Sequence, residues 1–206
     1  MSPLRTTEYL PVAYLPGASG RSSAWEPIAN VLAHRREAFL FAYPGLGDAP
    51  QQEIRSLNDL VHWVASELPE RCDLVALSMG STIALSLALE YPERIRRLVL
   101  VVPCGGMNAE RFGALDWRQA FVSARPFAPR WFVTDTSDFS ERLAQIKAPT
   151  LLVHGEDDPI APPAIGEFML DRLPNAKLEV VSDATHDLEE EHPAFLASLI
   201  EAHFRC

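Results

Sequence analysis

The stretch Leu74-Val75-Ala76-Leu77-Ser78-Met79-Gly80-Ser81 decides the fold. An apolar run leads into Ser78, small residues stand two positions before and two positions after it, and a segment with helical periodicity follows. Small residues are needed there because a tight turn between a strand and a helix brings bulky side chains against neighbouring backbone. The pattern predicts a nucleophile turn that points the Ser78 hydroxyl out of a sheet; the alternative is a serine that only caps a helix. The backbone N–H of Met79 would then lie at a helix N-terminus, where it can stabilise an oxyanion.

On both sides of this turn, short apolar runs alternate with longer segments of helical periodicity. Such alternation is typical of parallel strands joined by covering helices. The expected strands are Leu10–Leu15, Ala38–Ala42, Cys72–Leu77, Arg97–Val102, Thr150–His154 and Lys177–Val181. The expected helices lie near Ala24–His34, Leu57–Leu68, Met79–Tyr91, Pro163–Leu173 and Pro193–Phe204. The sequence therefore predicts an α/β fold, a three-layer sandwich with about six mostly parallel strands and helices on both faces.

Length and charge exclude several classes of function. At 206 residues the chain has the size of a single domain. Its formal net charge of −10 disfavours approach to nucleic acid and to anionic membranes, so neither is expected as a partner. No apolar stretch reaches the ~18 residues of a membrane span, and the first residues lack a secretory pattern, so a cytoplasmic location is expected. The three cysteines and six histidines show no metal-ligand spacing, and no cofactor or metal is expected.

Residues 103–147 interrupt the alternation. Residues 117–132 read WRQAFVSARPFAPRWF, and a further strand with its helix does not fit into the interval. We expect a small lid here, with Trp117, Phe121 and Trp131 facing the substrate and favouring an apolar acyl chain. The alternative is that these aromatic side chains only cover the core. The arginines of the segment could meet a substrate carboxylate or an acidic carrier protein, although exposed arginines are common.

The nucleophile turn and the order of the motifs around it resemble the α/β-hydrolase superfamily over nearly the whole chain. Members of that superfamily run from an oxyanion loop to the nucleophile, then to an acid after the next-to-last strand and a histidine after the last. Matching segments occur here in the same order. The resemblance implies the α/β-hydrolase fold and a catalytic triad that includes Ser78.

The same resemblance indicates the triad acid. Residues 151–162, LLVHGEDDPIAP, are similar to the superfamily's glycine-x-x-aspartate loop, which points to Asp158. Asp157 is the alternative acid in the same loop. The alternative without a catalytic role is that this loop is only a solvated acidic turn closed by Pro159.

His186 follows the last apolar strand and precedes the final helix. A short loop at this place can bring its ring back over the edge of the sheet. An imidazole that titrates near neutral pH can take the proton of a serine hydroxyl and later return one to the leaving group. We therefore expect His186 to be the general base, held in its tautomer by Asp158; the alternative is a polar surface residue.

The loop after the first strand, residues 15–20, resembles the superfamily's histidine-glycine oxyanion loop, which makes the backbone N–H of Ala18 the second oxyanion donor beside Met79. The alternative is an ordinary glycine turn. The sequence departs from the usual pattern at Pro16 in place of the loop histidine, at Ala76 in place of the first glycine of the turn, and at Thr185 in place of the glycine before the base. None of these changes removes a reacting group.

Together these features predict a serine hydrolase that cleaves an ester or thioester of a small-molecule acyl substrate, free or carrier-linked, through an acyl-Ser78 intermediate. Two alternatives remain. One is a lyase or carbon–carbon bond hydrolase on the same triad, similar to the menaquinone-pathway synthase. The other is a ligand-binding receptor that retains the triad.

Overall fold

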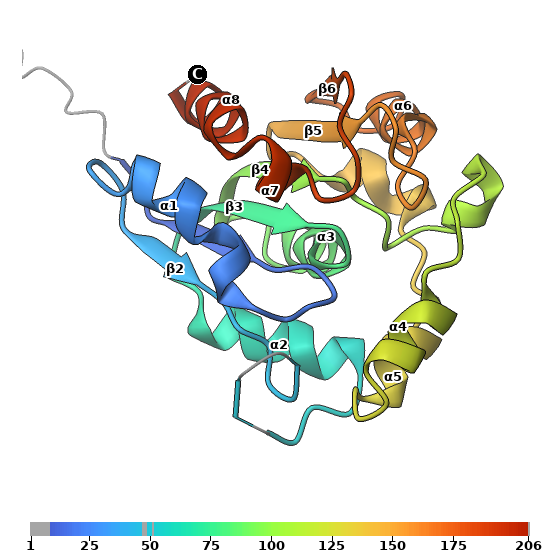
Figure 1. The fold of residues 1–206 in the computed structure, drawn as a ribbon. Coiled ribbons are helices and arrows are strands. Elements are labelled where there is room, and N and C mark those ends of the chain that lie inside the picture. The colour runs from blue at the N-terminus through green and yellow to red at the C-terminus, as the bar shows by residue number, and fades with distance from the viewer. Residues whose placement is uncertain (1–8, 47–48, 51, 206) are drawn as a thin grey trace, which may run out of the picture.

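Six parallel strands form one sheet in the order β2-β1-β3-β4-β5-β6 (Figure 1). The structure is a computed structural model that describes residues 9–46, 49–50 and 52–205. The strands are β1 (Val12–Leu15), β2 (Ala38–Leu40), β3 (Cys72–Leu77), β4 (Ile95–Val101), β5 (Thr150–Gly155) and β6 (Ala176–Val181). The predicted α/β sheet of about six parallel strands is confirmed, with strand ends shifted by one or two residues.

Helices cover both faces of the sheet. One face carries α1 (Glu26–Leu32) and α8 (Pro193–Arg205), which pack on each other, and the other carries α2 (Leu57–Glu67), α3 (Gly80–Glu90) and α6 (Pro163–Leu170). Figure 1 shows α1 and α8 together on one side of β3, and α2 and α3 on the other. The predicted three-layer arrangement therefore holds.

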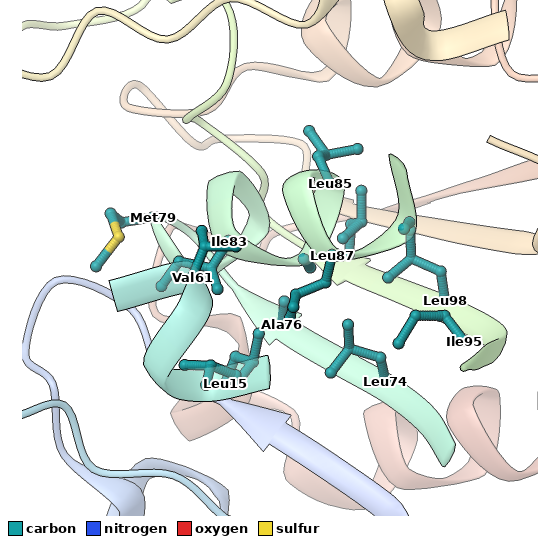
Figure 2. Close-up of a cluster of buried hydrophobic side chains, with 14 of the residues drawn as sticks. Leu15, Val61, Leu74, Ala76, Met79, Ile83, Leu85, Leu87, Ile95 and Leu98 are labelled. Atoms are coloured by element: carbon teal, nitrogen blue, oxygen red, sulfur yellow. The ribbon is translucent and has the colours of Figure 1, made fainter. Parts of the chain in front are cut away.

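Strand β3 illustrates how side chains of one strand are divided between the two faces of the sheet. Leu74 and Ala76 belong to the core cluster that holds the side chains of α2 and α3, whereas Val75 and Leu77 belong to the cluster with α1 and α8. Successive strand residues point to opposite faces, so a continuous apolar run fills both cores at once. Figure 2 shows the first of these clusters, in which Ile83 of α3 lies with Ala76 among the buried side chains.

The strand order places a switch point beside β3. The chain passes from β1 outward to β2 at one edge and then returns across β1 to form β3, after which the strands follow one another toward β6. The loops that leave the carboxyl ends of β1 and β3 therefore diverge, and such a divergence opens a crevice in a parallel α/β sheet. The two loops are those that carry Ala18 and Ser78.

Between β4 and β5 the chain forms only short helices. They are η2 (Ala109–Phe112), α4 (Arg118–Ala124), α5 (Arg130–Thr134) and η3 (Ser140–Gln145). Figure 1 shows α4 and α5 beside the sheet rather than on either of its faces. None of the helices in the described part of the chain combines the length and hydropathy of a membrane-spanning segment.

Candidate active site

Ser78 stands at the turn between β3 and α3. Its φ of 49° lies in the left-handed region, and its N–H donates to the carbonyl of Val101 at 2.8 Å. A Cβ at position 80 would lie 2.5 Å from the carbonyl oxygen of Pro16, so Gly80 is the residue that lets the loop after β1 pass over the start of α3. The backbone thus fixes where the serine side chain emerges.

A chain of two hydrogen bonds joins three side chains at the carboxyl edge of the sheet. The Oγ of Ser78 lies 2.8 Å from Nε2 of His186, and Nδ1 of His186 lies 2.7 Å from Oδ2 of Asp158. An ionised carboxylate only accepts hydrogen bonds, so Nδ1 carries the proton and Nε2 is free to accept the serine proton. The three residues expected from the sequence are therefore brought together.

In the loop after β5, the carboxylate of Asp158, and not that of Asp157, contacts His186. Oδ1 of Asp158 accepts hydrogen bonds from the N–H groups of Ile160 at 2.8 Å and Ala161 at 2.9 Å. Burial on its own raises the pKa of Asp158, but the hydrogen bonds from His186 and from these two N–H groups outweigh it and hold the pKa below its ordinary value. Asp157 is exposed, and its carboxylate is not part of the chain of hydrogen bonds.

A second histidine, His154, binds the loop that carries Asp158. His154 is fully buried in β5, and its Nδ1 lies 2.9 Å from the carbonyl oxygen of Ala161, to which it must donate. Burial lowers the pKa of His154, so the ring is neutral, and its Nε2 has no hydrogen-bond partner among the described residues. The sequence offered one signal of this role, a histidine inside an otherwise apolar strand.

The loop after β1 packs closely against Ser78. A Cβ at position 17 would be 3.3 Å from the Cβ of Ser78, and the hydroxyl of Tyr43 donates to the carbonyl of Pro16 at 3.0 Å. Within the described residues, the N–H groups of Ala18 and Met79 make no hydrogen bond to the protein. The two N–H groups expected from the sequence to be oxyanion donors are therefore unpaired within the described residues.

Cys104 is a neighbour of Ser78 that the sequence analysis did not identify. Its Sγ lies 3.2 Å from Oγ of Ser78, and burial raises the pKa of the thiol to about 11. The thiol is therefore protonated at neutral pH. Because the serine proton is directed to His186, the Cys104 S–H is the donor in its contact with Ser78.

A cavity of about 690 Å³ adjoins this centre. Met79 and Cys104 contribute to its wall, while most of the remaining lining comes from residues 105–138. Its charged side chains are four carboxylates and one guanidinium. These are Glu110, Asp116, Asp135, Asp138 and Arg118. The lining of the cavity therefore carries more negative than positive charges, although the segment as a whole does not.

The aromatic residues of the segment divide between the cavity and the core. Trp117 and Phe132 line the cavity. Phe121 and Trp131 do not, contrary to expectation: Phe121 is buried against Trp117, and the Trp131 indole donates to the carbonyl of Ile54 at 3.1 Å. Phe121 of α4 packs on Phe132 of α5, and Trp131 is directed to Ile54 by its indole hydrogen bond, so these two rings lie outside the cavity lining.

The described residues contain no group of three or more His, Cys, Asp or Glu side chains that could hold a metal ion. The chemistry that the arrangement supports is that of an activated serine oxygen beside two free backbone donors.

Comparison with known proteins gives consistent matches. Residues 12–132 match a sequence profile described as the alpha/beta hydrolase family, and residues 124–193 match one described as the alpha/beta hydrolase fold. The chain is 29% identical to a pimeloyl-[acyl-carrier protein] methyl ester esterase of Aeromonas hydrophila, covering 92% of this chain and 93% of that protein. It is 26% identical to the protein of the same name from Nitrosomonas europaea, covering 84% and 86%.

Solved structures share the fold. An alpha/beta hydrolase enzyme from a Medee basin deep-sea metagenome library superposes with a TM-score of 0.80 at 18% identity, covering 98% of this chain and 91% of that one. At this identity the likeness concerns the fold alone.

Proposed function

The chain belongs to the alpha/beta hydrolase family and is a serine ester hydrolase, and we propose that Ser78 is its nucleophile, His186 its general base and Asp158 the acid that orients the base. The observation that carries this proposal is the 2.8 Å contact between Ser78 and His186, continued at 2.7 Å to Asp158. A serine hydroxyl is a weak nucleophile unless such a base accepts its proton.

The first half of the reaction acylates the serine. Nε2 of His186 takes the hydroxyl proton while Oγ of Ser78 attacks the acyl carbon, and the negative charge moves to the carbonyl oxygen. The free N–H groups of Ala18 and Met79 are the proposed donors to that oxygen. As the carbon–oxygen bond to the leaving group breaks, the imidazolium returns the proton to the departing alkoxide, which leaves as an alcohol.

The second half restores the enzyme. A water molecule gives a proton to His186 and its oxygen attacks the acyl carbon, and collapse of this intermediate returns the proton to Ser78 and releases the acid. Asp158 stays ionised throughout, because its hydrogen bonds keep its pKa low, and it stabilises the imidazolium that forms in each half.

The proposed substrate is an ester or thioester of a small acyl group. The similar proteins of Aeromonas and Nitrosomonas are named for a carrier-linked methyl ester, which makes a carrier-linked substrate part of the proposal.

We also propose that residues 103–147 act as a lid, since they line most of the cavity. A cytoplasmic location belongs to the same proposal, supported by the free thiols of Cys72 and Cys104.

Intact mass after incubation with a fluorophosphonate tests the nucleophile without knowledge of the substrate. We expect one adduct on the wild type, none on Ser78→Ala and a strongly slowed reaction on His186→Ala. Ser81→Ala is the matched control, because Ser81 is also buried and its hydroxyl has no partner in the described residues. On an activated ester, Ser78→Ala should lower kcat by about 10⁶-fold and Asp158→Asn by about 10⁴-fold.

Two results would contradict the proposal. Folded wild type that forms no adduct would exclude an activated serine and favour the lyase, carbon–carbon hydrolase or receptor alternatives. An adduct that persists in Ser78→Ala would place the nucleophile elsewhere.

A further inference from the structure

The loop that carries His186 has no regular structure of its own. It joins β6 to the four-residue helix α7 (Leu188–Glu191), and Asp183 within it has a φ of 57°. The catalytic geometry depends on this loop, because the His186 ring must meet Ser78 on one side and Asp158 on the other. Something other than strand or helix hydrogen bonds must hold it.

On its inner side the loop rests against the end of β5. The N–H of Asp157 donates to the carbonyl of Ala184 at 3.0 Å. A Cβ at position 155 would lie 2.3 Å from that carbonyl and 2.5 Å from the carbonyl of Thr185, so Gly155 allows the two backbones to touch. These contacts set how close the loop lies to the sheet, but they hold only the inner side of the loop.

On its outer side a single carboxylate holds the residue next to the base. Glu191 accepts two hydrogen bonds from Thr185, from the N–H to Oε2 and from Oγ1 to Oε1, each at 2.8 Å. These two bonds hold the pKa of Glu191 below its ordinary value, which means that the ionised carboxylate is the form that binds. Hydrogen bonds to a charged acceptor are stronger than neutral ones.

Thr185 is also one of the positions at which the sequence departs from the pattern it resembles. A glycine there has an N–H but no hydroxyl, so it could make only one of the two bonds. The threonine therefore adds a second fixed point one residue before His186. Both bonds end on the same carboxylate, which resists rotation of the peptide that leads into the base.

We propose that Thr185 and Glu191 are a positioning pair that holds His186 in line with Ser78 and Asp158. The proposal rests on the catalytic role proposed above for His186. A base displaced by a fraction of an ångström loses alignment with the nucleophile, and such losses appear in the chemical step rather than in substrate binding.

The test compares Thr185→Val, which removes the hydroxyl at constant shape, with Thr185→Ser, which keeps it. Glu191→Gln removes the ionised acceptor, and Glu190→Gln is its matched control, because Glu190 is an exposed neighbour on α7 with the same charge change. We expect Thr185→Val and Glu191→Gln to lower kcat by about fivefold with KM unchanged, and to slow fluorophosphonate labelling equally. Thr185→Ser and Glu190→Gln should behave as wild type.

Circular dichroism and thermal melting show whether each variant is folded, and the comparison of kcat with KM is made only on folded protein. If Thr185→Val and Glu191→Gln react as fast as Glu190→Gln while the wild type is labelled, the pair does not position the base. The inference about the pair then fails, and the proposed function stands. If the wild type is not labelled at all, the proposed function fails, and the inference fails with it. Full recovery in Thr185→Ser after loss in Thr185→Val supports the pair.

Discussion

The backbone of Ser78 has an unfavourable conformation, with a φ of 49°. A residue with a side chain in the left-handed region costs roughly 1–2 kcal/mol relative to the helical region. The cost is borne because β3 and α3 fix the chain on both sides, and because the Ser78 N–H still finds the carbonyl of Val101. The backbone therefore sets the direction of the Ser78 hydroxyl, which contacts the side chains of His186 and Cys104.

Cys104 provides a prediction at this scale. Its protonated thiol donates to the Ser78 oxygen, so we expect Cys104→Ala to lower kcat on an activated ester by about five- to tenfold, the value of one neutral hydrogen bond. Cys104→Ser keeps a donor of similar size and should stay within about threefold of the wild type. Steady-state kinetics on one ester series measures both variants.

Wild-type activity in Cys104→Ala would mean that the thiol only fills space beside the nucleophile. Cys72→Ala is a matched control, because Cys72 is buried in β3 and is likewise a free thiol. It should leave kcat unchanged even if it lowers stability.

At the scale of elements, the strands and the long periodic helices could be predicted and the short helices could not. The continuous apolar run of β3 was predicted to the residue, since burial on both faces leaves a strong pattern. Helix α7 and the short helices of residues 103–147 were not, because four to seven residues make only about one to two turns, too few for a helical period to repeat. Asp157 and Asp158 were similarly hard to separate, since the deciding N–H groups of Ile160 and Ala161 depend on the path of the loop.

Helix α7 carries a buried acid that makes stability depend on pH. Burial, with smaller contributions from Asp187 and Glu190, raises the pKa of Glu189 from 4.5 to about 7. The folded chain therefore holds a proton that the unfolded chain releases between these pH values, and the free energy of unfolding falls as pH rises through this window. Glu189→Gln should be more stable than wild type by up to about 3 kcal/mol near pH 8 and equal to it near pH 4.

Urea unfolding of wild type and Glu189→Gln at several pH values measures this difference. Glu53→Gln is the control, because Glu53 is exposed and is not among the groups that raise the pKa of Glu189, so its loss should leave the pH dependence unchanged. A gap between wild type and Glu189→Gln that is the same near pH 4 and near pH 8 would contradict the assignment.

At the scale of the whole molecule, the fold gathers residues that are distant in sequence. Parallel strands end at one edge, so the loops after β1, β3, β4, β5 and β6 bring Ala18, Ser78, Cys104, Asp158 and His186 to one place. The order of the motifs along the chain was sufficient to identify the three side chains that the structure joins by hydrogen bonds. The composition of the cavity was not predictable in this way, because an aromatic sequence does not tell which rings face a cavity and which pack on each other.

The charge of that cavity leads to the last prediction. Four carboxylates and one guanidinium line it, in a chain whose formal net charge is −10. Hydrogen bonds from Ser140 to Asp138 outweigh its burial and keep its pKa low, so this carboxylate is ionised at neutral pH. An acyl chain that ends in a carboxylate should therefore be a poorer substrate than a neutral chain of the same length, by about tenfold in kcat/KM at low salt.

The p-nitrophenyl ester of hexanoic acid and the p-nitrophenyl monoester of adipic acid form a matched pair of six-carbon acyl chains. We expect the neutral ester to be preferred, with a ratio of kcat/KM that shrinks as salt screens the carboxylates. Glu110→Gln and Asp116→Asn each remove one negative charge from the wall and should move the ratio toward one, whereas Glu53→Gln, exposed and outside the cavity lining, should not. Equal kcat/KM for the two esters at low salt would mean that the acyl chain does not enter this cavity, and that the substrate reaches Ser78 from another side.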